Sequence, residues 1–198
     1  MSSGLFAAFV VFAVATLFTP GPNNVMLMTS GVNFGFRRTL PHVLGVDFGF
    51  GFMVAVVGVG LGAIFTAVPI LYSILKYAGA AYLLYLAWHI ARSGAVRENA
   101  EAHPLTFLQA AAFQWINPKG WIMAIGAATT YAAIAAFPFN TALMVAVFVA
   151  FGLLSSLTWL LFGTGLRRIV TDPRMVRIFN VAMAGLLVLS LVPVFLET

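Results

Sequence analysis

Two short segments of this sequence combine helix-breaking residues with amide or cationic side chains. The first is Thr19-Pro20-Gly21-Pro22-Asn23-Asn24, and the second is Asn117-Pro118-Lys119. A proline removes a backbone N–H and clashes with the preceding turn, so each segment predicts an interrupted helix with freed carbonyl groups. Amide side chains can bind both an ammonium and a carboxylate, and the helix resuming after the first break points its positive end back at it. We therefore expect both segments to bind or gate a small polar molecule, although a packing kink is the alternative for the first.

The composition places both segments inside a membrane. Of 198 residues, 62% are hydrophobic and 8% are charged, and the mean hydropathy is +1.04, whereas soluble domains carry about 25% charged residues. A bilayer offers no water to freed backbone groups, so a break survives only where protein or a wet cavity surrounds it. The net charge of +5 lacks the aromatic and basic face of a nucleic-acid-binding protein. The sequence contains no cysteine, which excludes disulfides, thiolate metal sites and cysteine nucleophiles.

Six apolar runs are each long enough to cross a bilayer, which takes about 20 residues in a helix. They cover about residues 4–32, 40–65, 70–91, 105–136, 139–163 and 175–196. A polar turn at 33–38 separates the first two runs, and Asp172-Pro173 predicts the start of the last. We predict an all-α integral membrane protein with one transporter domain over 1–198, built from three-helix halves at about 1–96 and 104–198.

The basic residues indicate the orientation of these helices. With six spans, one side of the membrane holds Arg37, Arg38, Arg92, Arg97 and the basic group at 167–177, while the opposite loops hold no Lys or Arg. Loops rich in Lys and Arg remain cytoplasmic. We therefore expect the Arg-rich loops on the cytoplasmic face of a bacterial inner membrane, with both termini outside.

The two breaks occupy corresponding positions in the two halves. Each lies in the first span of its half, and three spans per half invert the second half relative to the first. A matched pair of Gly- or Pro-interrupted helices is the best sequence indication of a transporter binding site. The breaks are therefore predicted to face each other across one transport path.

Two charged residues inside the apolar runs are candidate site residues. Lys119 would bind a substrate carboxylate or titrate during transport, and the alternative is a side chain extending to the membrane interface. Asp47 would carry a proton or balance a substrate amine, and the alternative is a structural pair with Lys119, Arg37 or Arg38. At about 1.5 Å per residue, straight helices place Asp47, not Lys119, beside the first break. This estimate predicts a cytoplasm-side gate formed by residues 20–24 and Asp47.

Two uncharged polar side chains complete the candidate site. Gln114 lies one turn before Asn117 and would share its face. Tyr82 is near the middle of the third run and would either line the cavity or pack against neighbouring helices. His42 and His103 lie in or next to loops without the spacing of metal ligands, so no metal or other cofactor is expected.

Three motifs together resemble those of one transporter family. Pro20-Gly21-Pro22-Asn23 resembles a PGPN signature, Asn117-Pro118-Lys119 resembles an NPK element of the fourth span, and residues 76–86 resemble a K-x-x-G-x-x-Y-L-x-x-L stretch of the third. The chain is similar on these motifs, and in length and span count, to the lysine exporter (LysE/RhtB) family of amino-acid efflux transporters. The resemblance implies antiport-type export of amino acids or related metabolites, driven by the proton gradient or membrane potential. The resemblance does not identify the substrate. It supports a role for Asp47 less strongly, because some branches of the family carry an acid at this position and others do not.

The sequence favours a secondary exporter over an enzyme or a channel. It has no G-x-x-x-x-G-K-[ST] motif for ATP, and no paired acids or Ser–His arrangement lies within a span. A passive small-solute channel remains the alternative, because oligomer symmetry can supply a ring of like residues. The expected partners are a small-molecule substrate and the lipid bilayer, and the apolar surface permits a homodimer.

Overall fold

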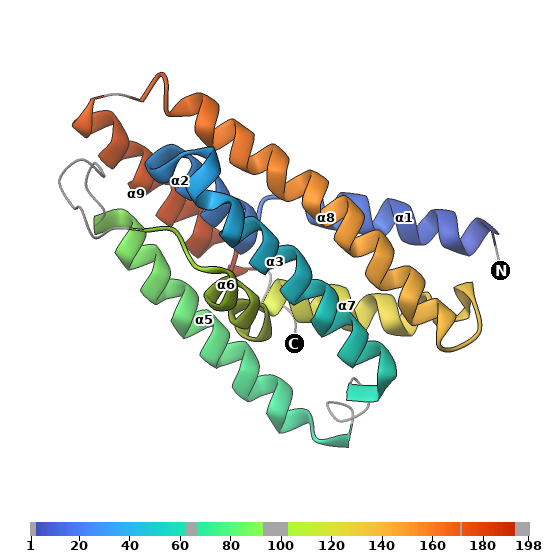
Figure 1. The fold of residues 1–198 in the computed structure, drawn as a ribbon. Coiled ribbons are helices and arrows are strands. Elements are labelled where there is room, and N and C mark those ends of the chain that lie inside the picture. The colour runs from blue at the N-terminus through green and yellow to red at the C-terminus, as the bar shows by residue number, and fades with distance from the viewer. Residues whose placement is uncertain (1–2, 62–66, 93–102, 171, 193–198) are drawn as a thin grey trace.

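The computed structural model describes residues 3–61, 67–92, 103–170 and 172–192, and the regular elements among these residues are all helical (Figure 1). In chain order they are α1 (Ser3–Phe18), α2 (Pro22–Phe34), α3 (Phe36–Val56), the π-helical turn η1 (Val57–Leu61), α5 (Pro69–Arg92), α6 (Phe107–Phe113), the 3₁₀ turn η3 (Gln114–Ile116), α7 (Pro118–Thr130), the 3₁₀ turn η4 (Ala132–Ile134), α8 (Phe139–Leu166) and α9 (Pro173–Leu189). The predicted all-α class is confirmed for these residues.

The first helix break separates α1 from α2. α1 ends at Phe18, and α2 begins at Pro22, whose missing N–H suits the first position of a helix. Gly21 has φ −171° and ψ 179°, an extended conformation that any residue adopts. The two helices meet at an angle of 47°, as expected where prolines interrupt the hydrogen-bond ladder. The break therefore lies at the residues that the sequence predicted.

The second break separates α6 and η3 from α7. α6 begins with a capping box in which the Thr106 and Gln109 side chains each bind the other's backbone N–H. The chain then tightens into η3 and unwinds at Asn117, with φ −81° and ψ 108°. Pro118 already occupies the first turn of α7, so the unwound part is shorter than the predicted segment, which also included Lys119.

Close helix contacts assemble the centre of the bundle. α3 packs against α6 and α8, and α2 packs against α8. A Cβ at Gly49 would lie 2.5 Å from the Cα of Ala111 on α6, and one at Gly31 would lie 2.7 Å from the carbonyl oxygen of Leu160 on α8. Small residues at these positions let the helix backbones approach closely.

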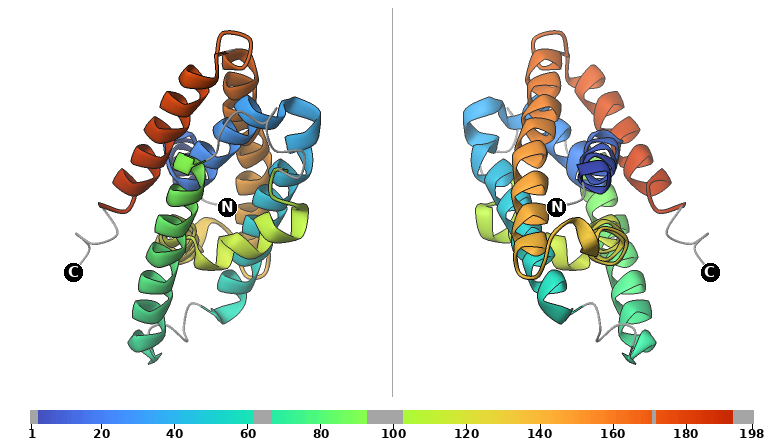
Figure 2. Two further views of the ribbon diagram at one scale, coloured as in Figure 1. Left: turned by 90° about the vertical axis from the view of Figure 1, so that its left-hand side faces the viewer. Right: turned by 90° about the vertical axis from the view of Figure 1, so that its right-hand side faces the viewer.

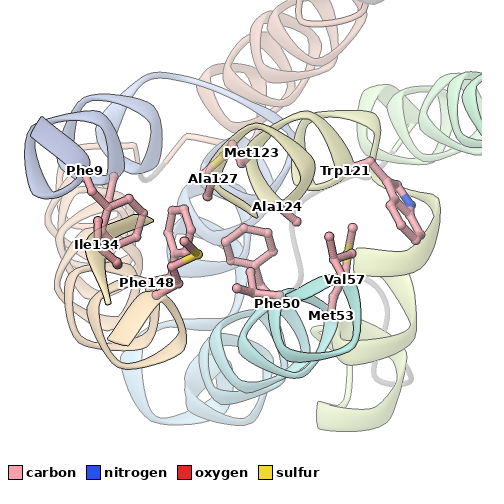
Figure 3. Close-up of a cluster of buried hydrophobic side chains, with 13 residues drawn as sticks. Phe9, Phe50, Met53, Val57, Trp121, Met123, Ala124, Ala127, Ile134 and Phe148 are labelled. Carbon is pink, nitrogen blue, oxygen red and sulfur yellow. The ribbon is translucent and has the colours of Figure 1, made fainter. Parts of the chain in front are cut away.

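The two larger apolar clusters among the described residues lie on either side of the breaks along the chain. The first cluster includes α1, α3, α7 and α8, where Phe9 and Phe50 meet Phe148 edge-on at ring-centroid distances of 5.3 and 5.2 Å (Figure 3). The second cluster contains Leu83 of α5 and Leu187 of α9, together with residues of α2 and α6. The helices α5 and α9 pack side by side (Figure 2). Each break therefore lies where the chain passes from one cluster to the other.

Three helical segments among the described residues are suited to cross a membrane. Phe36–Gly60 and Phe139–Leu166 are long and apolar enough individually, and the bent pair α1–α2 meets the same criteria as one broken span. The remaining described helices do not meet these criteria of length and composition. The count of six spans in two inverted halves therefore stays a prediction.

The connection between α2 and α3 is shorter than expected. The sequence predicted a polar turn over 33–38, but α2 continues to Phe34 and α3 begins at Phe36. Gly35 alone makes the turn with φ 80°, a conformation that residues with a Cβ rarely adopt. Arg37 and Arg38 consequently lie in the first turn of α3 rather than in a loop.

The start of α9 agrees with the sequence. Asp172 caps the helix, accepting a hydrogen bond from the backbone N–H of Arg174 at 2.7 Å. α9 begins at Pro173, close to the predicted start of the span at 175–196. The end of that span, and Arg97 between the two predicted halves, lie outside the described residues.

Candidate functional site

A cavity lies where the two helix breaks meet the middles of α3 and α8. The predicted site residues that line it are Gly21, Pro22, Asn23, Asn24, Asp47, Asn117 and Lys119. The cavity offers about 40 Å³ to the centres of water molecules, and one water needs about 10–15 Å³ by this measure. It therefore has room for a few waters and must widen to accept a larger molecule.

Side chains satisfy the carbonyl groups that the first break frees. The Leu17 carbonyl accepts hydrogen bonds from Asn24 Nδ2 and Ser155 Oγ, both at 2.8 Å. The Thr19 carbonyl accepts one from Asn24 Nδ2 at 2.9 Å. A buried carbonyl without a partner costs about 1–3 kcal/mol, so Asn24 stabilises the unwound backbone. The amide nitrogen of Asn24 is thus committed to the break rather than to a ligand.

Hydrogen bonds join the two breaks, and the residues that directly follow Pro22 and Pro118 form them. Asn23 and Gln114 form a reciprocal amide pair, with N···O distances of 2.9 and 3.1 Å. Lys119 reaches in the opposite direction, and its Nζ donates to the carbonyl and the hydroxyl of Thr19, both at 3.0 Å. The residue after each break thus contacts the residues just before the other break.

The position of Lys119 corrects the depth estimate. Straight helices placed Asp47 beside the first break and excluded Lys119 from it, whereas the lysine ammonium contacts the break directly. The 47° bend between α1 and α2 and the length of the lysine side chain invalidate a one-dimensional estimate. Both charged residues line the same cavity.

Asp47 and Asn117 present unsatisfied acceptors in the cavity wall. Asp47 is 4% exposed, Ser156 on α8 lies within hydrogen-bonding reach of its carboxyl, and its Oδ2 has no hydrogen-bond partner. Asn117 is 2% exposed, and its Oδ1 also has no partner. The Lys119 ammonium is directed at Thr19 rather than at Asp47. Buried acceptors are normally paired, so a ligand with N–H donors would satisfy both groups.

The remaining predicted residues lie outside the cavity wall. Tyr82 is partly buried and packs against the second apolar cluster, with its ring centroid 5.9 Å from that of Phe113. This position agrees with the alternative that Tyr82 packs against neighbouring helices, and Tyr82 does not line this cavity. Pro20 is exposed, and Pro118 is buried at the start of α7. Gln114 is buried and contacts Asn23, which does line the cavity.

Sequence reasoning missed the contribution of α8. Gly152, Ser155 and Ser156 line the cavity together with residues of both breaks. A run of small and hydroxyl residues in the middle of an apolar span was the available signal, since such residues are enriched where membrane helices meet. Within the part of the chain that the structure describes, no group of three His, Asp or Glu residues could hold a metal ion.

Gly152→Ala is expected to impair the site without removing a polar group. A Cβ at this position would lie 2.5 Å from Asp47 Oδ1, so the carboxyl group must move from its place in the wall. We expect severalfold slower transport with a normal amount of membrane-inserted protein. Gly185→Ala is the matched control, because a Cβ at Gly185 meets no atom within 4 Å. Equal transport by both variants would show that the position of the Asp47 carboxyl is unimportant.

Comparison with known proteins identifies the family that shares these features. A family model described as LysE type translocator matches residues 14–196, which include both breaks and Asp47. The chain belongs to the LysE type translocator family. It is 30% identical to the cysteine/O-acetylserine efflux protein of Salmonella typhimurium over 197 residues, which cover 98% of this chain and 100% of the relative. The cysteine/O-acetylserine efflux protein of Escherichia coli K12 is 29% identical over the same shares of the two chains. No solved structure matches the chain.

The match confirms the resemblance that the motifs indicated. This LysE type translocator is thus a membrane transport protein of an amino-acid export family. The structure adds a role for the third motif: a Cβ at Gly79 on α5 would collide with the carbonyl of Ile116 and lie 3.4 Å from Pro118 Cδ. Glycine there lets α5 approach the second break.

Proposed function

We propose that this LysE type translocator exports small amino acids with uncharged side chains, as a secondary transporter. The observation that carries the proposal is a partly open cavity with one cationic and one anionic residue that do not bind each other. A free amino acid carries both complementary charges. The relatives named as cysteine/O-acetylserine efflux proteins support substrates of this size and charge.

The cavity suggests how such a molecule binds. Its carboxylate would meet the Lys119 ammonium at the first break, and its ammonium would meet Asp47 Oδ2 and Asn117 Oδ1. Both of these oxygens lack other partners, and hydrogen bonds to charged groups contribute about 1.5–3 kcal/mol each. The side chain would face the apolar wall formed by Val46 and Phe50. If the bound amino acid were lysine or glutamate, its side chain would place an unpaired charge against that wall.

Transport would follow from movement of the two halves around this site. We propose six spans in two inverted halves within one domain over residues 1–198, with both termini outside and the Arg-rich loops in the cytoplasm. The reciprocal contacts between the breaks support this arrangement, because each half supplies one side of the cavity. Export would use the proton gradient or the membrane potential by antiport across the bacterial inner membrane, and a homodimer is compatible with the apolar surface.

Transport in vesicles tests the proposal. Inverted membrane vesicles containing the protein should take up labelled L-cysteine, kept reduced, when a pH gradient or potential is imposed, and vesicles without the protein should not. Excess O-acetyl-L-serine should compete, whereas excess L-lysine should not. Uptake that rises linearly with concentration and ignores the gradient would favour a passive channel. A protein that moves neither L-cysteine nor O-acetyl-L-serine would contradict the proposal.

A further inference from the structure

We infer that Thr19 is a positioning residue that holds the Lys119 ammonium in place for the carboxylate of the transported molecule. Thr19 lies in the unwound segment between α1 and α2, and Lys119 reaches it from α7 in the other half of the chain. The inference rests on the proposed function, because it assigns the carboxylate to Lys119.

The helix break makes the Thr19 carbonyl available for this contact. In an uninterrupted helix this carbonyl would accept the backbone N–H of the residue four positions later. Here it accepts hydrogen bonds from Lys119 Nζ at 3.0 Å and from Asn24 Nδ2 at 2.9 Å. The unwound backbone therefore supplies a negative dipole to the ammonium of the partly buried Lys119 side chain.

The Thr19 hydroxyl is oriented to accept a hydrogen bond from the same ammonium. Its Oγ1 donates to the Thr16 carbonyl at 2.8 Å, which uses the only proton of the hydroxyl. Its lone pairs are then left for Lys119 Nζ, at 3.0 Å. Thr19 thus provides two acceptors that fix the ammonium from one side.

This arrangement leaves Lys119 one donor for a ligand. An ammonium has three N–H donors, and two are directed at Thr19. The lysine stem also lies close over the break, because a Cβ at Gly21 would be 2.9 Å from both its Cδ and its Nζ. Lys119 lines the cavity, so its remaining donor can meet a carboxylate there. Fixing a flexible side chain before binding lowers the entropy lost when the ligand arrives.

Removal of the Thr19 hydroxyl tests the inference. Thr19→Val keeps the branched shape and loses the hydroxyl, whereas Thr19→Ser keeps the hydroxyl. For labelled L-cysteine, kept reduced, we expect Thr19→Val to raise KM about tenfold, equivalent to about 1.4 kcal/mol, with an unchanged maximal rate. Thr19→Ser should restore the wild-type KM. Thr129→Val is the matched control, because the exposed Thr129 hydroxyl donates only within its own helix, to Ile125 and Gly126.

A double-mutant cycle shows whether Thr19 acts through Lys119. In a Lys119→Met background, Thr19→Val should change the dissociation constant for L-cysteine less than twofold, because the contact is already lost. The loss of the bond to the Thr16 carbonyl is the same in both backgrounds, so the cycle cancels it. In the same proteins without substrate, the changes in unfolding midpoint caused by Thr19→Val and by Lys119→Met should not add up in the double variant. This measurement reports the contact independently of transport.

Three results would overturn the inference. They are a Thr19→Val KM within twofold of wild type, a Thr19→Ser variant as impaired as Thr19→Val, or an undiminished effect of Thr19→Val in the Lys119→Met background. If Lys119→Met binds too weakly to measure, the comparison of the valine and serine variants decides. Failure of the wild-type protein to move L-cysteine would instead contradict the proposed function, and additive unfolding midpoints would then exclude the Thr19–Lys119 contact itself.

Discussion

Asp47→Asn is expected to slow amino-acid export by about 10- to 100-fold, because a hydrogen bond to a charged group contributes about 1.5–3 kcal/mol. Asparagine keeps the size of the side chain and its reach toward Ser156 on α8. It removes the negative charge that the buried Oδ2 presents to the cavity without a partner. The expected measurement is the initial rate of L-cysteine uptake into inverted vesicles, normalised to the amount of inserted protein.

Asp172→Asn is the matched control for Asp47→Asn. It makes the same chemical change at the cap of α9, where asparagine serves as well as aspartate.

Equilibrium binding separates the two roles proposed for Asp47. A counter-ion for the substrate amine predicts a raised dissociation constant, whereas a proton carrier predicts normal binding with loss of gradient-driven flux. Wild-type flux in Asp47→Asn would exclude both roles.

Lys119→Met is expected to reduce export by a similar factor of about 10 to 100, through loss of the charged hydrogen bond to the substrate carboxylate. Methionine preserves an unbranched side chain of similar bulk against Gly21. The variant also removes both contacts with Thr19, so the first break loses a tether to α7. Lys76→Met on α5, outside the cavity wall, is the control for removing a lysine from an apolar helix.

Two analogues distinguish the ends of the binding site. Cysteamine lacks the carboxylate of L-cysteine, and 3-mercaptopropionate lacks its amine. Inhibition of L-cysteine uptake by cysteamine should weaken in Asp47→Asn and be retained in Lys119→Met, while inhibition by 3-mercaptopropionate should show the reverse. The opposite pattern would mean that the substrate lies the other way round in the cavity.

The sequence predicted the breaks because their cause is local. Proline acts on its own turn whatever surrounds it, so Pro22 and Pro118 each start a new helix at the expected place. The apolar composition and the matched spacing of the breaks also predicted a membrane transport protein, and the LysE type translocator match confirms that class.

The hydrogen-bond partners were beyond sequence reasoning because they depend on distances between helices. The pairs Asn23–Gln114 and Lys119–Thr19 join residues separated by 91 and 100 positions. Their formation requires the bend at the first break and the close packing of α3 on α6 and α8. An estimate of residue depth along straight helices includes neither the bend nor the packing between helices.

What the sequence determined by itself is thus a set of local properties: where helices stop, which spans are apolar, and which intramembrane side chains are polar or charged. The tertiary structure decided which of these side chains meet. It placed Lys119 on the first break, packed the partly buried Tyr82 against an apolar cluster and brought the small residues of α8 to the cavity. The physical reason is that backbone geometry is set within one turn, whereas a binding cavity is set by bends and packing that bring distant turns together.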